Sequence, residues 1–280
     1  ASESTARRRM RVIGRMLGSL LLGAIAIPGS MMVFRQGLLP LLDAAFHPGP
    51  AGLSAIRRAG ILLSALVGYW AYVHWHEKRE ATELRLQPVR LLIAGASGAG
   101  LLALPVAALF ALGAYEMILF RGALPALFGA AAVIGIAATL EELTFRCLLF
   151  QLLEQAWGTR VALAAQAVLF ALQHLGNLEH GGIVAVVVML MSVTLLGLLW
   201  AGVFLLTRNL WAAAANHAAW NFTILLSGVP LSGIEDWRQV APLESRYSGP
   251  AWLTGGMFGP ESSLLVIVSI TIAVVLLMRT

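Results

Sequence analysis

Long apolar segments, separated by short polar ones, form the dominant pattern along the chain. Most of them reach about 17–25 residues, the length that a helix needs to cross roughly 30 Å of hydrocarbon. They lack the alternating strands of about ten residues that build a membrane barrel. The sequence therefore predicts an all-α, polytopic integral membrane protein with about eight transmembrane helices, over residues 12–34, 59–75, 89–112, 122–157, 161–175, 183–206, 210–226 and 262–278.

Glycine and proline mark several of the connections between these segments. Pro28-Gly29 predicts a kink or an early end of the first helix. Residues 36–58 contain His47-Pro48-Gly49-Pro50 and are interpreted as a loop, in which a short interfacial helix can also form. Gly158 is expected to end the long fourth helix and to begin a hairpin.

Two further connections complete the predicted organisation. We expect a turn over residues 176–182, with Glu179 and His180 in solvent, and a polar loop over 227–261. The chain then divides into three regions: N-terminal transmembrane helices with a basic N-terminus (1–121), a catalytic transmembrane core (122–226), and a polar loop with a final transmembrane helix (227–280).

Composition and charge support the membrane assignment. Of the residues, 59% are hydrophobic and 12% are charged, whereas a soluble domain carries about a quarter charged residues. The net charge of +5 comes from arginines beside apolar spans, which fits topology control and anionic lipid headgroups rather than nucleic acid. Their distribution predicts a cytoplasmic N-terminus, and the first apolar run is expected to remain as a membrane span. Only Lys78 among 19 basic residues is lysine, so we expect a GC-rich genome and a bacterial inner membrane.

Two smaller features limit the remaining possibilities. The charged stretch over residues 76–88 is interpreted as a solvated helical connector, because runs of charge usually form exposed faces. The single cysteine, Cys147, excludes an intrachain disulfide and a multi-cysteine metal site.

Three ionisable residues, Glu141, Glu142 and Arg146, lie within the apolar segment 122–157. A charge at membrane depth costs a few kcal/mol and usually faces a protein interior or a water-filled cavity, which indicates a functional site. Glu142 precedes Arg146 by four residues, the favourable orientation for an ion pair on one helical face. This pairing assigns Glu142 and Arg146 a supporting role and leaves Glu141 as the candidate for chemistry.

Polar residues at helical spacing also occur in two later apolar segments. Phe170 and His174 are four residues apart, and so are His217 and Asn221, so each pair is expected on one face of its helix. Taken singly, the histidines would be interpreted as hydrogen-bonding contacts between helices. Their combination with an intramembrane carboxylate favours catalysis.

The predicted hairpin brings these groups into one chemical arrangement. Gly158 lies 17 residues after Glu141 and 16 residues before His174, so the two side chains should lie at similar depth on antiparallel helices. A carboxylate can act as general base on a water molecule with an imidazole assisting. His217 and Asn221 can donate hydrogen bonds to the oxyanion that develops during amide hydrolysis.

Together, Glu141-Glu142-x-x-x-Arg146, Phe170-x-x-x-His174 and His217-x-x-x-Asn221 resemble the three motifs of the CPBP (Abi) intramembrane proteases, which include the type II CAAX prenyl endopeptidases. The resemblance covers about residues 124–226. It implies a glutamate-dependent endopeptidase in which Glu141 activates water, His174 assists, and His217 with Asn221 forms the oxyanion hole. Phe170, Glu142 and Arg146 would support these groups. Cys147 departs from the family pattern, in which glycine is common after the arginine.

Three other functions remain open on the sequence. Glu141, His174 and His217 are a competent ligand set for catalytic zinc, although His-Glu-x-x-His is missing. A proton-coupled transporter would use them as a relay, but the expected paired repeats are not evident. A non-catalytic scaffold would bind the same peptide without cleaving it. We expect an endopeptidase that needs no cofactor, contacts membrane lipids, and acts on a membrane-anchored or lipidated peptide or protein.

Overall fold

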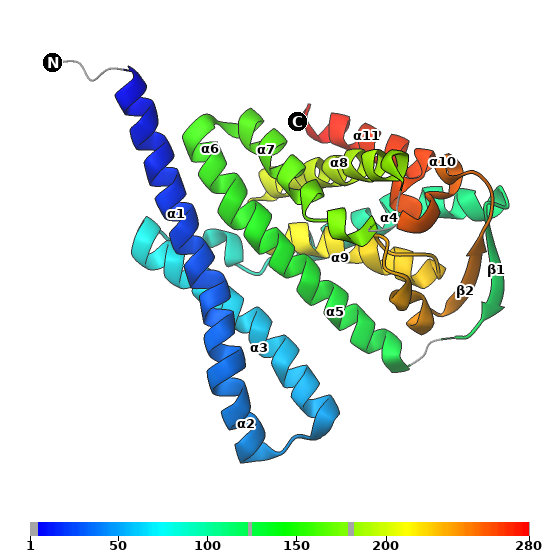
Figure 1. The fold of residues 1–280 in the computed structure, drawn as a ribbon, viewed down its shortest axis with the longest axis horizontal. Coiled ribbons are helices and arrows are strands. Elements are labelled where there is room, and N and C mark those ends of the chain that lie inside the picture. Colours follow the sequence, from blue (N-terminus) through cyan, green and yellow to red (C-terminus); the bar gives the residue numbers. More distant parts are fainter. Residues whose placement is uncertain (1–4, 123–124, 179–181, 280) are drawn as a thin grey trace. The chain divides into compact units, whose positions relative to one another are not determined.

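The protein, described by a computed structural model over residues 5–122, 125–178 and 182–279, is built mainly from helices (Figure 1). It divides into two compact units, each described below by itself. The first comprises Ala1–Arg85 with Thr139–Ala162, and the second comprises Leu86–Ala138 with Leu163–Thr280. Each unit contains helices that are long and apolar enough to span a bilayer.

The first unit begins with a long helical stretch of α1 (Thr5–Val33), a π-helical turn (Phe34–Leu38) and α2 (Leu39–Phe46). After a reversal at His47, whose φ is 45°, α3 (Gly49–Ala71) returns along α1 and ends in a second π-helical turn (Tyr72–Glu77). Small residues let these helices approach closely. A Cβ atom on Gly68 would lie 2.3 Å from the carbonyl oxygen of Ala26, so no larger residue fits there.

Two expectations about this region need correction. Pro28 lies inside α1 and does not end it early, because the apolar residues around it continue the helix and membrane helices tolerate an internal proline. The kink at Pro28-Gly29 stays a prediction. Residues 36–58 are helical apart from the short break at His47 and Pro48, and do not form a loop. Pro50 occupies the first turn of α3, where proline costs no hydrogen bond.

One continuous helical run passes from the second unit into the first. It consists of α5 (Pro125–Glu142), a π-helical segment (Leu143–Phe150) and α6 (Gln151–Trp157). Gly158 ends it with a φ of 83°, as predicted, and α7 (Thr159–Leu172) follows. The left-handed conformation at the break is one that glycine adopts at no steric cost.

The second unit is centred on α4 (Pro88–Ala111), α8 (Ile183–Thr207), α9 (Leu210–Ser227) and α11 (Leu264–Leu277). The α4 and α9 helices make the most extensive contact, and α8 packs against both α9 and α11 (Figure 1). Close approach again depends on glycine: a Cβ atom on Gly98 would lie 2.3 Å from the carbonyl oxygen of Asn216. The tight α4 contact therefore fixes α9, which carries His217.

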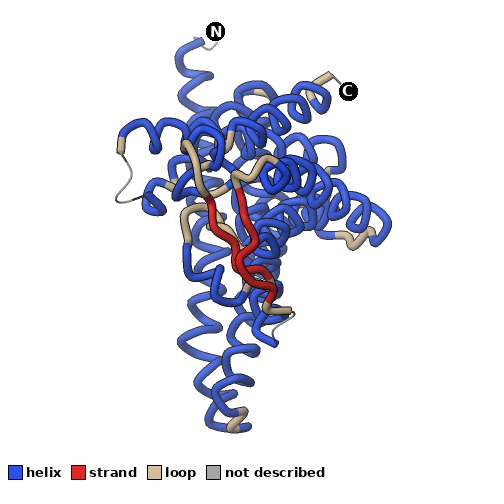
Figure 2. Tube along the Cα trace, turned by 90° about the vertical axis from the view of Figure 1, so that its right-hand side faces the viewer, coloured by secondary structure: helices blue, strands red, loops and turns tan. Residues whose placement is uncertain are grey.

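A two-stranded antiparallel sheet was not predicted. Strand β1 (Tyr115–Phe120) pairs with β2 (Leu243–Tyr247), with Tyr115 opposite Tyr247 and a bulge between Met117 and Leu119 (Figure 2). The β2 strand lies within the region interpreted as a polar loop. The same region also contains α10 (Ala251–Thr254) and three short 3₁₀ turns: Glu235–Val240, Gly256–Phe258 and Pro260–Ser262.

The predicted fold class, an all-α polytopic membrane protein, is confirmed. Within the described residues, helices occur at all eight expected segments, and five helical stretches have the length and composition to span a membrane: Met10–Phe46, Gly49–Glu77, Pro88–Ala111, Pro125–Trp157 and Ile183–Thr207. The final apolar helix, Leu264–Leu277, is shorter. Glu179 and His180 lie outside the described residues. The functional division into three regions stays a prediction.

Candidate active site

The acidic motif lies where the helical run of α5 widens into π-helical geometry. The π-helical segment begins at Leu143, directly after Glu142, and ends at Phe150. Such segments are rare and often occur at functional sites, because the extra residue per turn redirects the side chains around it. Glu141 and Glu142 therefore end a regular α-helix, whereas Arg146 lies in the widened part.

Glu142 and Arg146 form the predicted ion pair. The Nε atom of Arg146 lies 3.1 Å from Oε2 of Glu142, and both side chains are 0% exposed. Two opposite charges that are buried together tolerate the low dielectric of the interior, whereas either one alone would be costly. Glu141 is half-buried on the same helix and also lies within electrostatic range of Arg146. The pairing of Arg146 with Glu142 is the one that the spacing predicted.

His174 lies just beyond the last residue of α7, in a turn rather than on the helix itself. Its Nδ1 atom lies 2.9 Å from the backbone oxygen of Phe170. A carbonyl oxygen can only accept a hydrogen bond, so Nδ1 carries the proton and Nε2 is the acceptor nitrogen of the neutral ring. This geometry prepares His174 to accept a proton through Nε2.

His217 is held between aromatic rings in the second unit. Its imidazole stacks on the indole of Trp200, with ring centroids 3.5 Å apart and planes inclined by 15°. Phe170 meets the same imidazole edge-on at 6.1 Å and lies 4.9 Å from the ring of His174. Phe170 therefore touches both histidines, which gives a physical reason for its place in the motif.

The α9 helix that carries His217 and Asn221 is anchored at its N-terminus and along one side. The side chain of Asn209 caps its N-terminus by accepting a hydrogen bond from the backbone of Ala212, at 3.1 Å. Asn216 donates hydrogen bonds to Ala94 and Ser97 of α4, each at 3.0 Å. The amide oxygen of Asn221 is buried and has no hydrogen-bond partner among the described residues. A buried amide oxygen without a hydrogen-bond partner costs free energy, unless a ligand donates the missing hydrogen bond.

The predicted residues fall into two groups. The first unit contains Glu141, Glu142 and Arg146, and the second unit brings together the other four: Phe170, His174, His217 and Asn221. The approach of Glu141 to the histidines stays a prediction. Within either unit as described, no three His, Cys, Asp or Glu side chains lie together as a group that could hold a metal ion.

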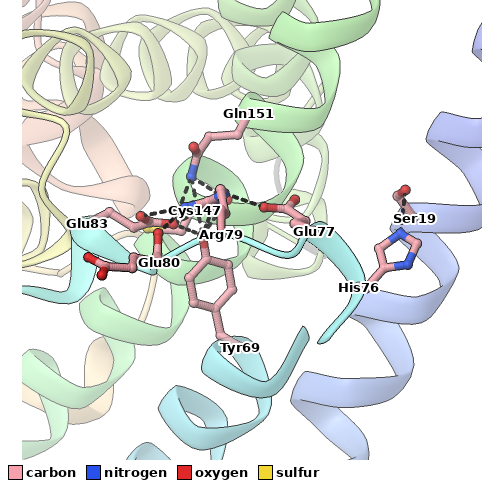
Figure 3. Close-up of polar contacts among 9 residues, drawn as sticks. All are labelled: Ser19, Tyr69, His76, Glu77, Arg79, Glu80, Glu83, Cys147 and Gln151. Carbon is pink, nitrogen blue, oxygen red and sulfur yellow. Dashed lines mark hydrogen bonds and ion pairs between the residues drawn. The ribbon is translucent and has the colours of Figure 1, made fainter. Parts of the chain in front are cut away.

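A polar cluster in the first unit corrects the prediction for residues 76–88. Glu83 is 3% exposed rather than solvated, and its carboxylate accepts hydrogen bonds from Arg79, at 2.8 and 2.9 Å, and from Tyr69 (Figure 3). Gln151 joins the cluster by donating to Tyr69 and to the backbone of Cys147. The charged run therefore contains a buried anchor for the helical run that also carries Glu141.

Charges in this cluster stabilise one another. Burial alone would raise the pKa of Glu83, but the hydrogen bonds from Arg79 and Tyr69 outweigh it, so the pKa is lowered. Burial alone would lower the pKa of Arg79. Its hydrogen bonds to Glu83 have the larger effect, so the pKa of Arg79 is raised. Both groups stay ionised at neutral pH. Sequence reasoning missed the cluster because it judged the run by its charge density alone.

Glu261 is a second acidic residue that sequence reasoning missed. It lies in the 3₁₀ turn Pro260–Ser262, is 2% exposed, and accepts a hydrogen bond from Ser232 at 2.6 Å. Burial raises the pKa of Glu261 to about 7, although Ser232, His217 and Trp220 act in the opposite direction. The indole nitrogen of Trp220 makes no hydrogen bond within the described residues. An acid between Gly-Pro and an apolar helix was the signal that could have identified it.

An apolar cavity of about 430 Å³ lies beside Glu261 in the second unit. Its walls come from the first half of α8 and from the segment around α10, with Val184, Val188, Trp252 and Phe258 among the lining residues. Ser262, the neighbour of Glu261, also lines it. An apolar cavity of this size can hold the side chains of a bound peptide or part of a lipid.

A comparison with protein families supports the motif assignment. The family model described as type II CAAX prenyl endopeptidase Rce1-like matches residues 123–223. The match includes all three motifs and confirms the resemblance predicted from them. Glu83 and Glu261 lie outside the matched residues. No curated protein and no solved structure matches the chain.

Proposed function

We propose, from the match of residues 123–223 to the Rce1-like family model of type II CAAX prenyl endopeptidases, that the chain is an intramembrane endopeptidase that uses Glu141 to activate water. The observation that carries the proposal is the cluster around Phe170, which holds the histidines of two different motifs against one ring. A shared aromatic support for two histidines fits a common reaction better than two separate helix contacts.

The reaction begins with proton transfer from water. Glu141 takes one proton, and the resulting hydroxide attacks the carbonyl carbon of the peptide bond. His174 assists through Nε2, because Nδ1 is committed to the backbone oxygen of Phe170. The proposal therefore requires Glu141 to approach His174 across the hairpin at Gly158.

His217 and Asn221 then stabilise the tetrahedral intermediate. The carbonyl oxygen gains a negative charge as the hydroxide adds, and donors aimed at that oxygen lower the barrier. The stacked ring of Trp200 limits the rotation of His217, so its N–H is oriented before the substrate arrives. Delivery of the proton from Glu141 to the amide nitrogen breaks the C–N bond and releases an amine and a carboxylic acid.

Glu142 and Arg146 act as supporting residues. Their buried ion pair neutralises one of two adjacent carboxylates, so Glu141 does not face an unbalanced charge on its own helix. We place the substrate among membrane-associated proteins that carry a lipid near the cleaved bond, because the matching family comprises prenyl endopeptidases. A bacterial inner membrane with a cytoplasmic N-terminus remains our proposal for the location.

The test uses the purified full chain in liposomes and a quenched fluorescent peptide that ends in a farnesylated cysteine, two aliphatic residues and a variable residue. Glu141→Gln and His174→Gln should lower the cleavage rate by about 10²–10⁴-fold. His217→Gln should lower it by about 10²–10³-fold. Binding of the peptide should be retained in all three variants.

Controls distinguish this function from the alternatives. Glu235→Gln changes an exposed carboxylate of the second unit and should leave cleavage unchanged. An unprenylated peptide shows whether the lipid is recognised. Cleavage at the wild-type rate by all three site variants would rule out the mechanism. Peptide binding without cleavage by the wild type would favour a scaffold, and proton flux into the liposomes would favour a transporter.

A further inference from the structure

The apolar cavity of about 430 Å³ in the second unit has a lining suited to hydrocarbon. Its walls are formed by glycines and by aliphatic, aromatic and thioether side chains: Val184, Ala185, Val188, Trp252, Met257 and Phe258. Among the described lining residues none is ionisable, and Ser262 contributes the one side-chain hydroxyl. A charged ligand would lose its hydration in this cavity without gaining a partner, so the lining favours an uncharged apolar chain.

Three of the lining side chains remain largely exposed: Val184 at 72%, Trp252 at 60% and Met257 at 59%. Val184 lies in the first turn of α8, a helix that is long and apolar enough to span a membrane. Exposed apolar groups beside a cavity mark a place where a membrane or an apolar ligand binds. A chain that is already dissolved in the bilayer can therefore enter the cavity from the side.

The wall formed by α10 and the turn after it is fixed before any ligand binds. Gly255 has a φ of 81°, and a Cβ atom there would lie 1.8 Å from the carbonyl oxygen of Gly259. The backbone N–H of Gly256 donates to the hydroxyl of Thr254 at 3.1 Å. The carbonyl oxygen of Thr254 accepts a hydrogen bond from the hydroxyl of Tyr115 at 2.6 Å. A preformed wall lowers the entropy cost of binding.

The same wall is connected to the segment that follows His174. The turn that ends at Phe258 packs against the turn Leu175–Leu178, which begins directly after His174. Gly233 joins the two turns: its N–H donates to the carbonyl oxygen of Phe258 at 3.0 Å, and a Cβ atom on it would lie 2.6 Å from the carbonyl oxygen of Asn177. A chain in the cavity would thus hold the peptide attached to it beside the segment of His174.

One polar group of the cavity lining lacks a hydrogen-bond partner. Ser262 is 6% exposed, and its hydroxyl has no partner among the described atoms. A buried hydroxyl in this state costs free energy, which a ligand recovers if it brings a hydrogen-bond acceptor. A bare hydrocarbon brings none, whereas a chain joined to a peptide brings carbonyl oxygens.

We propose that this cavity binds the isoprenyl chain of the substrate, and that the Ser262 hydroxyl donates a hydrogen bond to the peptide that carries the chain. This inference rests on the proposed function and adds to it a specificity site, part of which lies outside the residues that match the family model. The planar double bonds of an isoprenyl chain pack on the rings of Trp252 and Phe258. Saturated acyl chains of the bilayer lack these planar groups.

The first test fills the cavity. Ala185→Trp places a large ring in its lining, and Val187→Trp is the matched control, because Val187 lies on the same helix, is 56% exposed and does not line the cavity. The full chain in liposomes is assayed with the farnesylated peptide and with its unprenylated counterpart. One methylene group in a fitted apolar pocket is worth about tenfold. Ala185→Trp should therefore raise KM for the farnesylated peptide at least about tenfold and leave kcat/KM for the unprenylated peptide unchanged.

The outcomes separate this proposal from the proposed function. If the wild type cleaves neither peptide, the proposed function fails. If the wild type prefers the farnesylated peptide and Ala185→Trp keeps the whole preference, the cavity proposal is overturned while the endopeptidase function stands. An equal loss with both peptides, or an equal effect of Val187→Trp, would also overturn it, because general damage to the fold would then explain the result.

Photolabelling tests the site without any substitution. A peptide whose farnesyl chain ends in a diazirine should label lining residues such as Trp252 and Met257, as identified by mass spectrometry. An excess of the unmodified farnesylated peptide should remove this label. A phospholipid with a diazirine on its acyl chain that labels the same residues, and is not displaced by the peptide, would assign the cavity to bilayer lipid and overturn the proposal.

A serine substitution tests the hydrogen bond. Ser262→Ala loses no hydrogen bond within the described protein, so it should leave the unfolding temperature unchanged or raise it, and should weaken binding of the farnesylated peptide by about three- to tenfold. Ser227→Ala is the control, because its hydroxyl donates to Ile224 of its own helix at 2.6 Å, and it should leave peptide binding unchanged. Unchanged binding in Ser262→Ala would overturn the assignment of this hydroxyl.

Discussion

The imidazole of His217 and the indole of Trp200 form a parallel stack with centroids 3.5 Å apart. Both side chains are almost completely buried, at 3% and 1% exposure. A flat, apolar surface at this distance blocks rotation of the imidazole about its bond to the backbone while leaving its nitrogens at the ring edge for polar partners. Packing thus fixes the orientation of the imidazole that we propose as a donor to the oxyanion.

Removal of this surface should affect catalysis through His217. Trp200→Leu should lower peptide cleavage by about tenfold, because the imidazole gains freedom, and should also cost about 3 kcal/mol of folding free energy. Cleavage rates and chemical unfolding measure both effects. In a His217→Ala background the same change should cause little further loss of activity, since the two residues act together. Equal losses in the two backgrounds would contradict this account.

The buried ion pair predicts a non-additive effect on stability. Glu142→Gln alone leaves Arg146 charged in an apolar site and should destabilise the protein by about 3–5 kcal/mol. The double variant Glu142→Leu with Arg146→Met should be less destabilised than either single variant. Unfolding in detergent micelles measures the difference. A double variant that loses the sum of the two single losses would show that the pair is not coupled.

The cluster around Glu83 predicts a loss of stability in acid. Its pKa is lowered in the folded protein, so its contribution is complete above the pKa of a free glutamate, about 4.3, and disappears as the pH falls further through the folded value. Glu83→Gln should cost about 2 kcal/mol at neutral pH and little in strong acid. Thermal unfolding between pH 2 and pH 7 tests this expectation.

Glu80→Gln provides the control for that experiment. Glu80 lies in the same charged run and pairs with Arg85, but its side chain is 80% exposed. Exposed ion pairs contribute little to stability, so this change should leave the unfolding temperature almost unchanged at every pH. An equal effect of both variants would indicate that the overall charge of the run matters, and not the buried cluster.

The close contact of α4 with α9 predicts different effects for two neighbouring glycines. A Cβ atom on Gly98 would lie 2.3 Å from the carbonyl oxygen of Asn216, so Gly98→Ala should separate the helices, cost about 1–3 kcal/mol, and lower activity by displacing His217. Gly100 has no atom within 4 Å of its ideal Cβ position. Gly100→Ala should be neutral or slightly stabilising in both unfolding and cleavage assays.

Metal chelators should have no effect on cleavage. The proposed mechanism activates water with a carboxylate, so incubation with phenanthroline or EDTA should leave the rate within about twofold of the untreated enzyme. Inhibition that is reversed by added zinc would instead support the metalloprotease, in which Glu141, His174 and His217 would serve as ligands.

Features with a local cause could be predicted from the sequence. The hairpin at Gly158, the Glu142–Arg146 ion pair and the membrane helices follow from apolar length, helical spacing and the conformational freedom of glycine. The two-stranded sheet could not be predicted in this way, because Tyr115 and Tyr247 are distant in the sequence and neither strand alternates clearly. The role of Glu83 was missed for a similar reason, since its partners Tyr69 and Gln151 belong to other segments.

The candidate site shows the same division. Its motif residues could be identified by their spacing, and the cluster of Phe170 with both histidines agrees with that identification. Trp200 has no motif of its own, and its place beside the histidines depends on packing in three dimensions. Nothing local in the sequence shows that a tryptophan of α8 stacks on His217.

The π-helical segment Leu143–Phe150 absorbs an additional residue between the acidic motif and α6. A π-helical turn holds about one residue more than an α-helical turn, so deletion of one residue within this segment would restore a regular α-helix and leave the phase of Glu141 relative to α6 nearly unchanged. A deletion within a regular α-helical part of the run, such as α6, would instead rotate the residues beyond it by about 100°. The wider turns therefore make this part of the chain the more tolerant of a change in length.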